Sequence, residues 1–456
     1  MSAVQPLTAR ICVIGAGPSG IAAAKAMLDA GFADVSVFDR QTDVGGNWVF
    51  DDSAGHSSVF ETTHIISSKR FSQYDDYPMP TSYPDYPSHR QLAAYFQGYA
   101  QHFGLYPFIE FETSVEHCAP RDGGGWDVTV THDGVTRTET FDVLIVANGH
   151  HSVPRWPTYP GELTAEYLHS HDFKRAAPFR DKRVLVIGGG NSACDVAVET
   201  SRISTRTDIS WRRGYRIVPK FLFGVPGDVI HNAVSNRLGF IPSKLRFKSL
   251  EWMLLAMIGP NRRYGLPDPD HPLGATHPTL NSELLYALRH GRVTPRPDIE
   301  RWDGQTVTFT DGTQQDYDAV IACTGFQIAH PFFDRDVVDF SSGPVPLYLK
   351  MLPADRSDLA FVGLFQPLGC IWPSAALQAK ILARRLRGQW QPPADLAGAI
   401  DAELARPDVK QLDTPRHTIT VDAPAFRRRL LAELPSDFVV RSRSPIASDR
   451  LGGHAA

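Results

Sequence analysis

The chain has 456 residues, of which 42% are hydrophobic, and its formal net charge is −4. This length and hydrophobic content suffice for two or more domains with buried cores. The small negative charge gives no reason to expect nucleic acid as a partner. The five cysteines are widely spaced and form no CxxC pair, so the sequence supports neither a disulfide framework nor a dithiol redox centre.

The N-terminal segment lacks a signal-peptide pattern, because its first apolar run, 11–14, leads directly into a glycine-rich turn. No stretch has the roughly 20 apolar residues that a membrane-spanning helix needs. We therefore expect a cytoplasmic protein without membrane association. Residues 245–258 leave an alternative open, since apolar residues alternate there with basic ones. They form either an interfacial membrane helix or, as we favour because Glu251 interrupts the apolar face, a helical cover over a cleft.

The strongest pattern is a glycine-rich turn between the strand-like run 11–14 and the helix-like run 21–28. Gly15, Gly17 and Gly20 have the spacing of a dinucleotide-binding turn, in which backbone N–H groups at a helix N-terminus face a pyrophosphate. The next strand-like run ends in Asp39, 24 residues after the first glycine. An acid at this place suits the two free hydroxyls of a ribose. These residues predict a first dinucleotide site.

A second copy of the turn follows the apolar run 184–187 and comprises Gly188, Gly189 and Gly190. The strand-like run after it ends in Arg212 and Arg213, where the first copy has an acid. Arginine suits the 2′-phosphate of NADP(H). The sequence therefore predicts two different dinucleotides, the second of them NADP(H).

The two halves share one order: glycine-rich turn, helix, charged strand end, short strands, and a closing strand that ends in small residues. This internal repeat predicts an α/β fold with two nested Rossmann-like domains of the three-layer FAD/NAD(P)-binding type. We expect the FAD-binding domain in 1–165 and 328–440, with the NADPH-binding domain, 166–327, inserted between them. A helical insert is expected at about 221–275, and 441–456 is expected to be a disordered tail.

Taken in order, the motifs resemble the flavin-containing monooxygenases over about residues 10–385. The first turn and 45–48 (GGNW) are similar to that family's FAD site, and 147–151 (ANGHH) to its linker strand. Residues 169–174 (HSHDFK) resemble the signature before its NADPH turn, and 211–214 (WRRG) its NADPH site. The segments 277–281, 323–326 and 366–369, followed by Gln378, complete the series.

Three positions depart from the family's pattern. The signature normally opens with Phe-x-Gly, where this chain has 163–165 (LTA). The related Baeyer–Villiger enzymes end it in Trp-Pro, whereas Phe173 and Lys174 stand here and favour the amine- and sulfide-oxygenating branch. The family places an asparagine beside the flavin, and Ile66 occupies that position. His64, Ser67 or Ser68 would be the substitutes if the local alignment shifts.

The resemblance implies an NADPH- and O2-dependent FAD monooxygenase that oxygenates nitrogen or sulfur of a small molecule through a C4a-hydroperoxyflavin. An NADPH oxidase that releases peroxide, which Ile66 favours, and a Baeyer–Villiger monooxygenase acting on ketones are the enzymatic alternatives. A flavin-bound redox sensor is an alternative from another class. A homodimer is compatible with the sequence.

Ile66 and Asn191 are the candidate catalytic positions, and we expect the amide of Asn191 either to cap its helix or to reach the nicotinamide. No metal site is expected, because His169 and His171 alternate on one strand and lack further ligands. The remaining candidate cofactor contacts are Gly15, Gly17, Pro18, Ser19, Gly20, Asp39, Arg40, Gly46, Asn47, Trp48, Asn148, Gly149, His169, Gly188, Gly190, Ser192, Arg212, Arg213, Thr324, Gly325 and Gln378.

Overall fold

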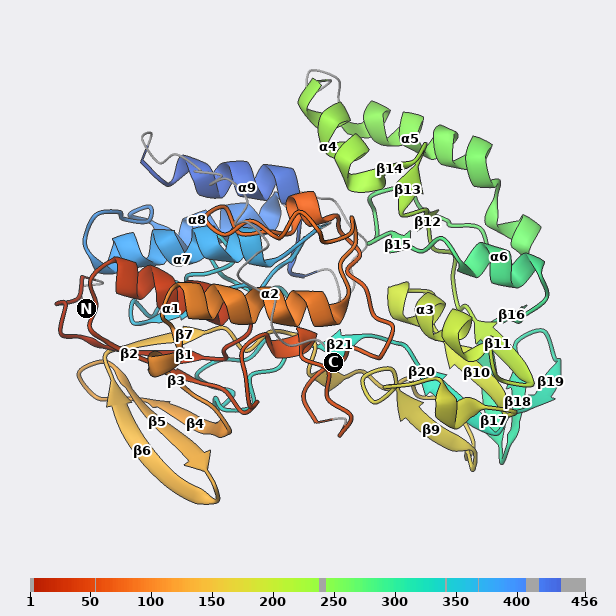
Figure 1. Cartoon of the computed structure of the whole chain (residues 1–456), viewed down its shortest axis with the longest axis horizontal. Helices are drawn as coiled ribbons and strands as arrows, with labels where there is room; N and C mark the ends of the chain where they lie inside the picture. Colours follow the sequence, from red (N-terminus) through yellow and green to blue (C-terminus); the bar gives the residue numbers. More distant parts are fainter. Residues whose placement is uncertain are drawn as a thin grey trace.

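A computed structural model describes residues 4–53, 55–237, 243–340, 343–367, 369–406 and 418–435. The described chain forms two lobes, each built on a five-stranded parallel sheet (Figure 1). The predicted fold class, α/β with two Rossmann-like units, is confirmed. The predicted tail, 441–456, lies outside the described residues.

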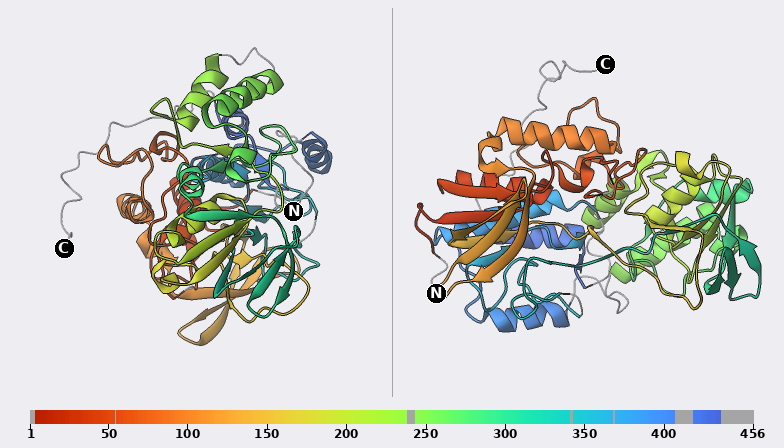
Figure 2. Two further views of the ribbon diagram at one scale, coloured as in Figure 1. Left: turned by 90° about the vertical axis from the view of Figure 1, so that its right-hand side faces the viewer. Right: turned by 90° about the horizontal axis from the view of Figure 1, so that it is seen from below.

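The first sheet combines strands from both ends of the chain, in the order β22-β7-β1-β2-β3. Its strands are β1 (Arg10–Ile14), β2 (Asp34–Phe38), β3 (Ile109–Glu110), β7 (Val143–Val146) and β22 (Leu359–Phe361). The pairing of β22 with β7 returns the chain to the first lobe after a long excursion. Figure 2 shows this return, since the red, orange and blue segments share one lobe.

Helices cover one face of the first sheet and an antiparallel sheet lies on the other side (Figure 1). The helices are α1 (Pro18–Asp29), α2 (His89–His102), α7 (Trp372–Leu386), α8 (Leu396–Ala405) and α9 (Ala423–Ala432). The antiparallel strands are β4 (Thr113–Pro120), β5 (Trp126–His132) and β6 (Val135–Phe141). Apolar side chains fill both interfaces, so the parallel sheet is buried on its two faces, as such sheets require.

The second sheet has the order β16-β11-β10-β20-β9, with all neighbours parallel. Its strands are β9 (Glu166–His169), β10 (Arg183–Ile187), β11 (Arg206–Ser210), β16 (Val293–Arg296) and β20 (Ala319–Ala322). Helices α3 (Asn191–Thr200) and α6 (Leu284–Arg289) accompany it, together with the antiparallel strands β17 (Ile299–Asp303), β18 (Thr306–Phe309) and β19 (Gln314–Asp316).

The predicted insert is helical and extends from the second lobe. It consists of the hairpin β13 (Phe221–Leu222) and β14 (Val225–Pro226), then α4 (Gly227–Arg237) and α5 (Ser243–Ile258). Two further short pairs are β12 (Ile217–Val218) with β15 (Thr279–Leu280), and β23 (Gln366–Pro367) with β24 (Thr420–Val421).

The chain passes between the lobes beside one short antiparallel ladder, β8 (Val153–Pro154) with β21 (Phe326–Gln327). Strand β8 follows the closing strand of the first sheet, and β21 follows that of the second. This topology agrees with one Rossmann unit inserted in another. The exact domain limits, 165/166 and 327/328, stay a prediction.

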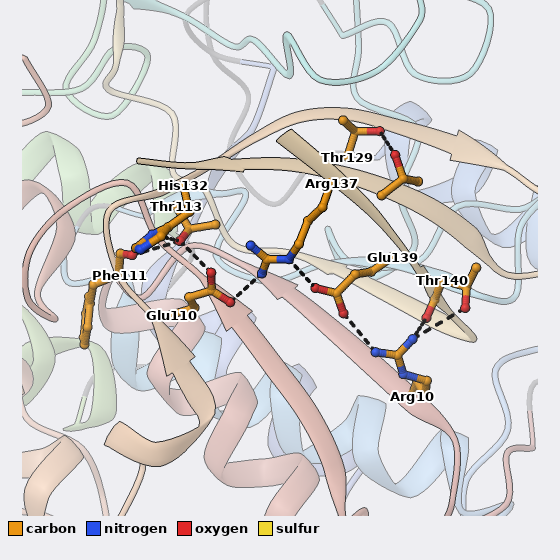
Figure 3. A network of polar contacts seen from close by, with 10 residues as sticks. Arg10, Glu110, Phe111, Thr113, Thr129, His132, Arg137, Glu139 and Thr140 are labelled. Atoms are coloured by element: carbon orange, nitrogen blue, oxygen red, sulfur yellow. Dashed lines mark hydrogen bonds and ion pairs between the residues drawn. The ribbon is translucent and has the colours of Figure 1, made fainter. Parts of the chain in front are cut away.

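An ion-pair network ties the antiparallel sheet to the first parallel sheet (Figure 3). Arg137 of β6 lies between Glu110 of β3, at 2.6 Å, and Glu139 of β6, at 2.9 Å. Glu139 also accepts a hydrogen bond of 3.0 Å from Arg10 of β1. All these side chains are more than a quarter exposed, so water screens the attraction.

We expect Arg137→Ala to lower the free energy of unfolding by only about 1 kcal/mol, because partly exposed ion pairs contribute little. The loss should shrink at high salt, which screens exposed charges. Urea denaturation at low and high salt measures it. Arg121→Ala, which removes a more exposed pair with Asp127 on β5, is the matched control. A salt-independent loss of several kcal/mol would show that Arg137 acts through packing instead.

Candidate functional site

The first glycine-rich turn leaves no room for a side chain at Gly15 or Gly20. Gly15 has φ +102°, and a Cβ atom at Gly20 would lie 1.7 Å from the carbonyl oxygen of Gly15. Helix α1 begins directly after this turn, with Gly17 as N-cap and no side-chain hydrogen bond on its first N–H groups. Such an N-terminus attracts anions through its free N–H groups and the helix dipole. The turn therefore fits a pyrophosphate.

Asp39 follows β2 at the edge of the sheet where this turn lies. Its carboxylate accepts hydrogen bonds from the N–H of Ala16, at 2.5 Å, and of Gln41, at 2.8 Å. The side chain is buried, and burial raises its pKa. Two backbone bonds leave lone pairs on both oxygens, which can accept from ribose hydroxyls. The carboxylate of Asp39 therefore fits the hydroxyls of an adenosine ribose, as its place in the sequence predicts.

The second turn repeats this geometry at the N-terminus of α3. Gly188 has φ +127°, and a Cβ atom there would lie 2.5 Å from the carbonyl oxygen of Cys323. Gly190 is the N-cap, again without a side-chain hydrogen bond. The two open helix N-termini thus provide the two anion sites that the repeat predicts.

Asn191 does not cap α3, which rules out one of its two predicted roles. It is the first residue of the helix, and its Oδ1 accepts a hydrogen bond of 2.7 Å from the N–H of Leu280. That bond fixes the side chain against β15. Asn191 borders the cavity described next, so contact with the nicotinamide stays the prediction for it.

One cavity of about 500 Å³ joins the two turns across the lobes. It is lined by most of the candidate residues: Gly15, Gly17, Pro18, Ser19, Asp39, Arg40, Gly46, Asn47, Trp48, Ile66, Asn148, Gly149, Gly190, Asn191, Ser192, Thr324 and Gly325. Residues as far apart as Gly15 and Gly325, 310 positions along the chain, therefore meet at a single site. The lining combines two glycine-rich turns with apolar and aromatic side chains, the usual character of a cofactor pocket.

Six candidates do not line this cavity: Gly20, His169, Gly188, Arg212, Arg213 and Gln378. Gly20 and Gly188 serve by allowing the close approaches described above. Gln378 is fully buried in α7, where its Oε1 accepts from the N–H of Gly363 and its Nε2 donates to the carbonyl of Leu349. It braces the turn at Gly363, a residue on the lining, while direct contact of Gln378 with a cofactor stays a prediction.

His169 is buried at the end of β9, between the rings of Trp156 and Phe326. Its Nδ1 accepts a hydrogen bond of 3.1 Å from the N–H of His171. Burial lowers the pKa of His169 to about 4, so the imidazole is neutral at physiological pH. Phe326 belongs to the cavity lining. His169 therefore packs against a lining residue without lining the cavity itself.

Arg212 and Arg213 follow β11, outside the lining but in the same lobe as the second turn. Arg212 is exposed, and the guanidinium of Arg213 lies 5.8 Å from the ring centroid of Tyr215. Neither forms an ion pair with any carboxylate in the described part of the chain. Both guanidinium groups, which follow the second dinucleotide turn in the chain, therefore remain available to bind a phosphate.

Ile66 lies in the irregular segment between β2 and α2, and its side chain borders the cavity. Of the three possible substitutes, His64 and Ser67 also border it, whereas Ser68 does not. The Ser67 hydroxyl is already bonded to that of Ser72 at 2.8 Å, and His64 Nδ1 to the carbonyl of Thr62. Ile66 thus presents an apolar residue to the cavity, and its assignment to the family's asparagine position stays a prediction.

Asp195 and Trp372 are two of the lining residues that were not selected as contacts from the sequence. Asp195 lies one turn after Asn191 on α3, where i, i+4 spacing places it on the same face. Burial raises its pKa to about 6, and Nδ2 of Asn281 donates to it at 2.7 Å. Trp372 packs edge-on against Trp48, at 5.8 Å between centroids. Helical spacing predicts the first of these, but no local signal marks the second.

Residues 8–412 match the flavin-binding monooxygenase-like family. The chain belongs to this family. Flavin-containing monooxygenase 5 of Cavia porcellus is 33% identical over 433 residues, which cover 91% of this chain and 80% of that protein. Flavin-containing monooxygenase 2 of Homo sapiens is 31% identical over 422 residues, covering 89% and 78%.

Solved structures share the fold at lower identity. S-allyl-L-cysteine S-oxygenase from Allium sativum has a TM-score of 0.68 at 21% identity, covering 93% of this chain and 88% of that chain. An open structure of cyclohexanone monooxygenase has a TM-score of 0.70 at 17% identity, covering 93% and 97%. The family and the two fitting dinucleotide sites together make this chain a flavin-dependent monooxygenase that uses FAD and NADPH.

Among the described residues, no helix combines the length and the apolar character needed to cross a membrane. Helix α5 has 16 residues and includes Glu251, which forms an ion pair with Arg216. That pair joins α5 to the second lobe, which agrees with a covering role for this part of the insert.

Proposed function

We propose that this monooxygenase transfers one oxygen atom of O2 to the nitrogen or sulfur of a small molecule, at the expense of NADPH. The observation that carries the proposal is the single cavity lined by both glycine-rich turns, because hydride transfer needs the two cofactors within contact distance, about 3–3.5 Å. When bound, FAD takes up the hydride and activates O2; this chemistry belongs to the cofactor.

The protein's own part is to bind, orient and exclude water. The N–H groups at the start of α1 and Asp39 hold FAD, and those at the start of α3, with Arg212 and Arg213, hold NADPH. Trp48 and Trp372 form an aromatic wall of the shared cavity. Such a wall keeps water from a reactive site. The contacts assigned from the sequence remain the proposed cofactor contacts.

The experiment that tests the proposal incubates the FAD-loaded enzyme with NADPH, O2 and either a thioether or a tertiary amine. A sulfoxide or N-oxide formed in a near one-to-one ratio to NADPH consumed is the expected result. Peroxide in that ratio, with every substrate tried, would contradict the proposal. Lactone formation from a cyclic ketone, without heteroatom oxidation, would assign the Baeyer–Villiger reaction instead.

A second candidate function, an NADPH oxidase, is favoured by one observation: Ile66, which the resemblance assigns to the position of the family's amide, is apolar and borders the cavity. An apolar side chain there would offer no hydrogen bond where a bound flavin would react with O2, and release of peroxide would be favoured. The proportion of NADPH recovered as peroxide separates the two functions.

For this reason Ile66→Asn should lower the peroxide released per NADPH by about two- to tenfold, the value of one added hydrogen bond. Peroxide and NADPH assays in the presence of the thioether measure it, because oxygen transfer to the substrate then competes with release of peroxide. Ile66→Leu, which keeps the position apolar, is the control and should leave the ratio unchanged. An equal or higher ratio in Ile66→Asn would show that Ile66 does not occupy the family's asparagine position.

We further propose that the enzyme acts in the cytoplasm on a freely diffusing substrate. A homodimer is proposed as its assembly, because the described surface exposes large apolar side chains, such as Trp252 and Tyr286. Size-exclusion chromatography with light scattering tests this assembly, and a monomer at every concentration would contradict it.

A further inference from the structure

The segment that carries Ile66 is anchored by two different parts of the molecule. On the side of the first lobe, the N–H of Ile65 donates to the carbonyl of Pro87 at 3.0 Å, and that of Lys69 to the carbonyl of Asp85 at 2.7 Å. Trp372 Nε1 also donates to the carbonyl of Ser72 at 2.8 Å. These bonds hold both ends of the segment but leave Ser67 and Ser68 between them.

The anchor in the middle comes from the helical insert of the second lobe. The N–H of Ser68 donates to Oδ2 of Asp228 at 2.6 Å, although the two residues are 160 positions apart. Asp228 is the second residue of α4, where a negative charge is stabilised by the helix dipole. Ser68 is only 2% exposed, so water does not replace this acceptor if it is removed.

A second contact runs beside the first. The hydroxyl of Tyr86 donates to the carbonyl of Lys220 at 2.6 Å, and its ring packs edge-on against Phe221 at 5.2 Å. Asp228 lies close enough to Tyr86 to raise the pKa of its phenol, although burial is the larger cause. Both contacts join the segment before α2 to the strand and helix that open the insert.

From these contacts we infer that Asp228 is a positioning residue: through Ser68 it holds the segment with Ile66 and Ser67 against the cofactor cavity. The insert thereby sets the shape of the cavity wall, and does more than cover it. Asp228 does not itself line the cavity, so its effect passes through the backbone of Ser68. Only the effect on oxygen transfer rests on the proposed function; the anchoring does not.

Removal of the acceptor leaves a buried N–H unpaired, at a cost of about 1–3 kcal/mol. The segment then opens locally more often, because the free energy of local opening depends on the hydrogen bonds that hold the segment in place. Water enters the cavity through this wall, and more of the reduced enzyme's electrons pass to peroxide. We therefore expect looser substrate binding and poorer coupling, with NADPH consumption almost unchanged.

The test compares Asp228→Ala with Asp228→Asn, whose carboxamide oxygen still accepts the Ser68 N–H. Hydrogen exchange on the FAD-loaded enzyme without NADPH should be roughly tenfold faster in 64–72 for Asp228→Ala, and near wild type for Asp228→Asn. In the same variants, turning over NADPH with a thioether present, the peroxide released per NADPH should rise about threefold or more for alanine only. Asp268→Ala, which removes an exposed partner of Arg262, is the control.

Unchanged exchange in Asp228→Ala, or equal effects of asparagine and alanine, would overturn the proposal. If Asp228→Ala does not fold, Asp228→Ser replaces it, since its shorter side chain withdraws the acceptor from the Ser68 N–H. It should also speed exchange in 64–72, and wild-type exchange there would overturn the proposal. A wild-type enzyme that oxygenates neither sulfur nor nitrogen contradicts the proposed function alone, because the exchange result stands apart from it.

Discussion

Gly20→Ala is expected to yield a protein that binds FAD at least about 100-fold more weakly and is less stable by about 3 kcal/mol. The added Cβ would lie 1.7 Å from the carbonyl oxygen of Gly15 and 2.8 Å from its carbonyl carbon. Both are backbone atoms of the turn itself, so relief requires α1 to move away from β1. The helix N-terminus then no longer faces the pyrophosphate. Thermal melting of the FAD-free protein and titration with FAD measure the two effects.

Gly17→Ala is the matched variant, because it separates packing from cofactor approach. Gly17 has φ −67°, and a Cβ atom there would meet nothing closer than 3.6 Å, the distance to Cα of Gly46. The FAD-free variant should therefore remain within about 1 kcal/mol of the wild type. FAD should still bind more weakly, since Gly17 lines the cavity. Equal stability losses in both FAD-free variants would contradict the packing argument.

The double variant Arg212→Ala with Arg213→Ala is expected to raise the KM for NADPH by roughly 10- to 100-fold, the value of one or two hydrogen bonds to a charged group. The KM for NADH should change by no more than about threefold, because NADH lacks the 2′-phosphate. Steady-state kinetics with each nucleotide measure the difference. The preference for NADPH in the wild type should also weaken at high salt.

Arg202→Ala is the control for this double variant. Arg202 belongs to the same lobe but is already engaged by Glu283, at 2.6 Å. Its loss should change neither KM by more than about twofold. Equal increases for NADPH and NADH in the double variant would show that neither arginine recognises the phosphate, and the assignment of the second turn to NADPH would then rest on the family alone.

The body of a helix was easier to predict than its first turn, for a physical reason. The helix-like run 21–28 lies within α1, which begins earlier, at Pro18. Pro18 falls in the first turn, where proline costs no hydrogen bond. Likewise, α5 covers the segment 245–258 but begins at Ser243. Apolar spacing marks the body of a helix, whereas its first turn carries little of that signal.

The roles of individual side chains were harder to predict than their locations. Gln378 stands in a motif that suggests cofactor contact, yet its amide is consumed by the backbone of Gly363 and Leu349. Asn191 had two open roles, and the N–H of Leu280 excluded one of them. In both cases the deciding partner lies on another element, so no local pattern contains the information.

The sequence by itself determined the two dinucleotide turns, the strands before them and the helices after them. These follow from glycine spacing, from short-range periodicity and from the sign of charge at two strand ends, all properties of neighbouring residues. Only the tertiary structure decided that both turns share one cavity, that the Gln378 amide bonds Gly363 and Leu349, and that Asp228 reaches Ser68 across 160 positions. Buried backbone N–H and C=O groups need hydrogen-bond partners, and these results depend on which distant side chains supply them. Which groups become buried is determined only when the whole chain has packed.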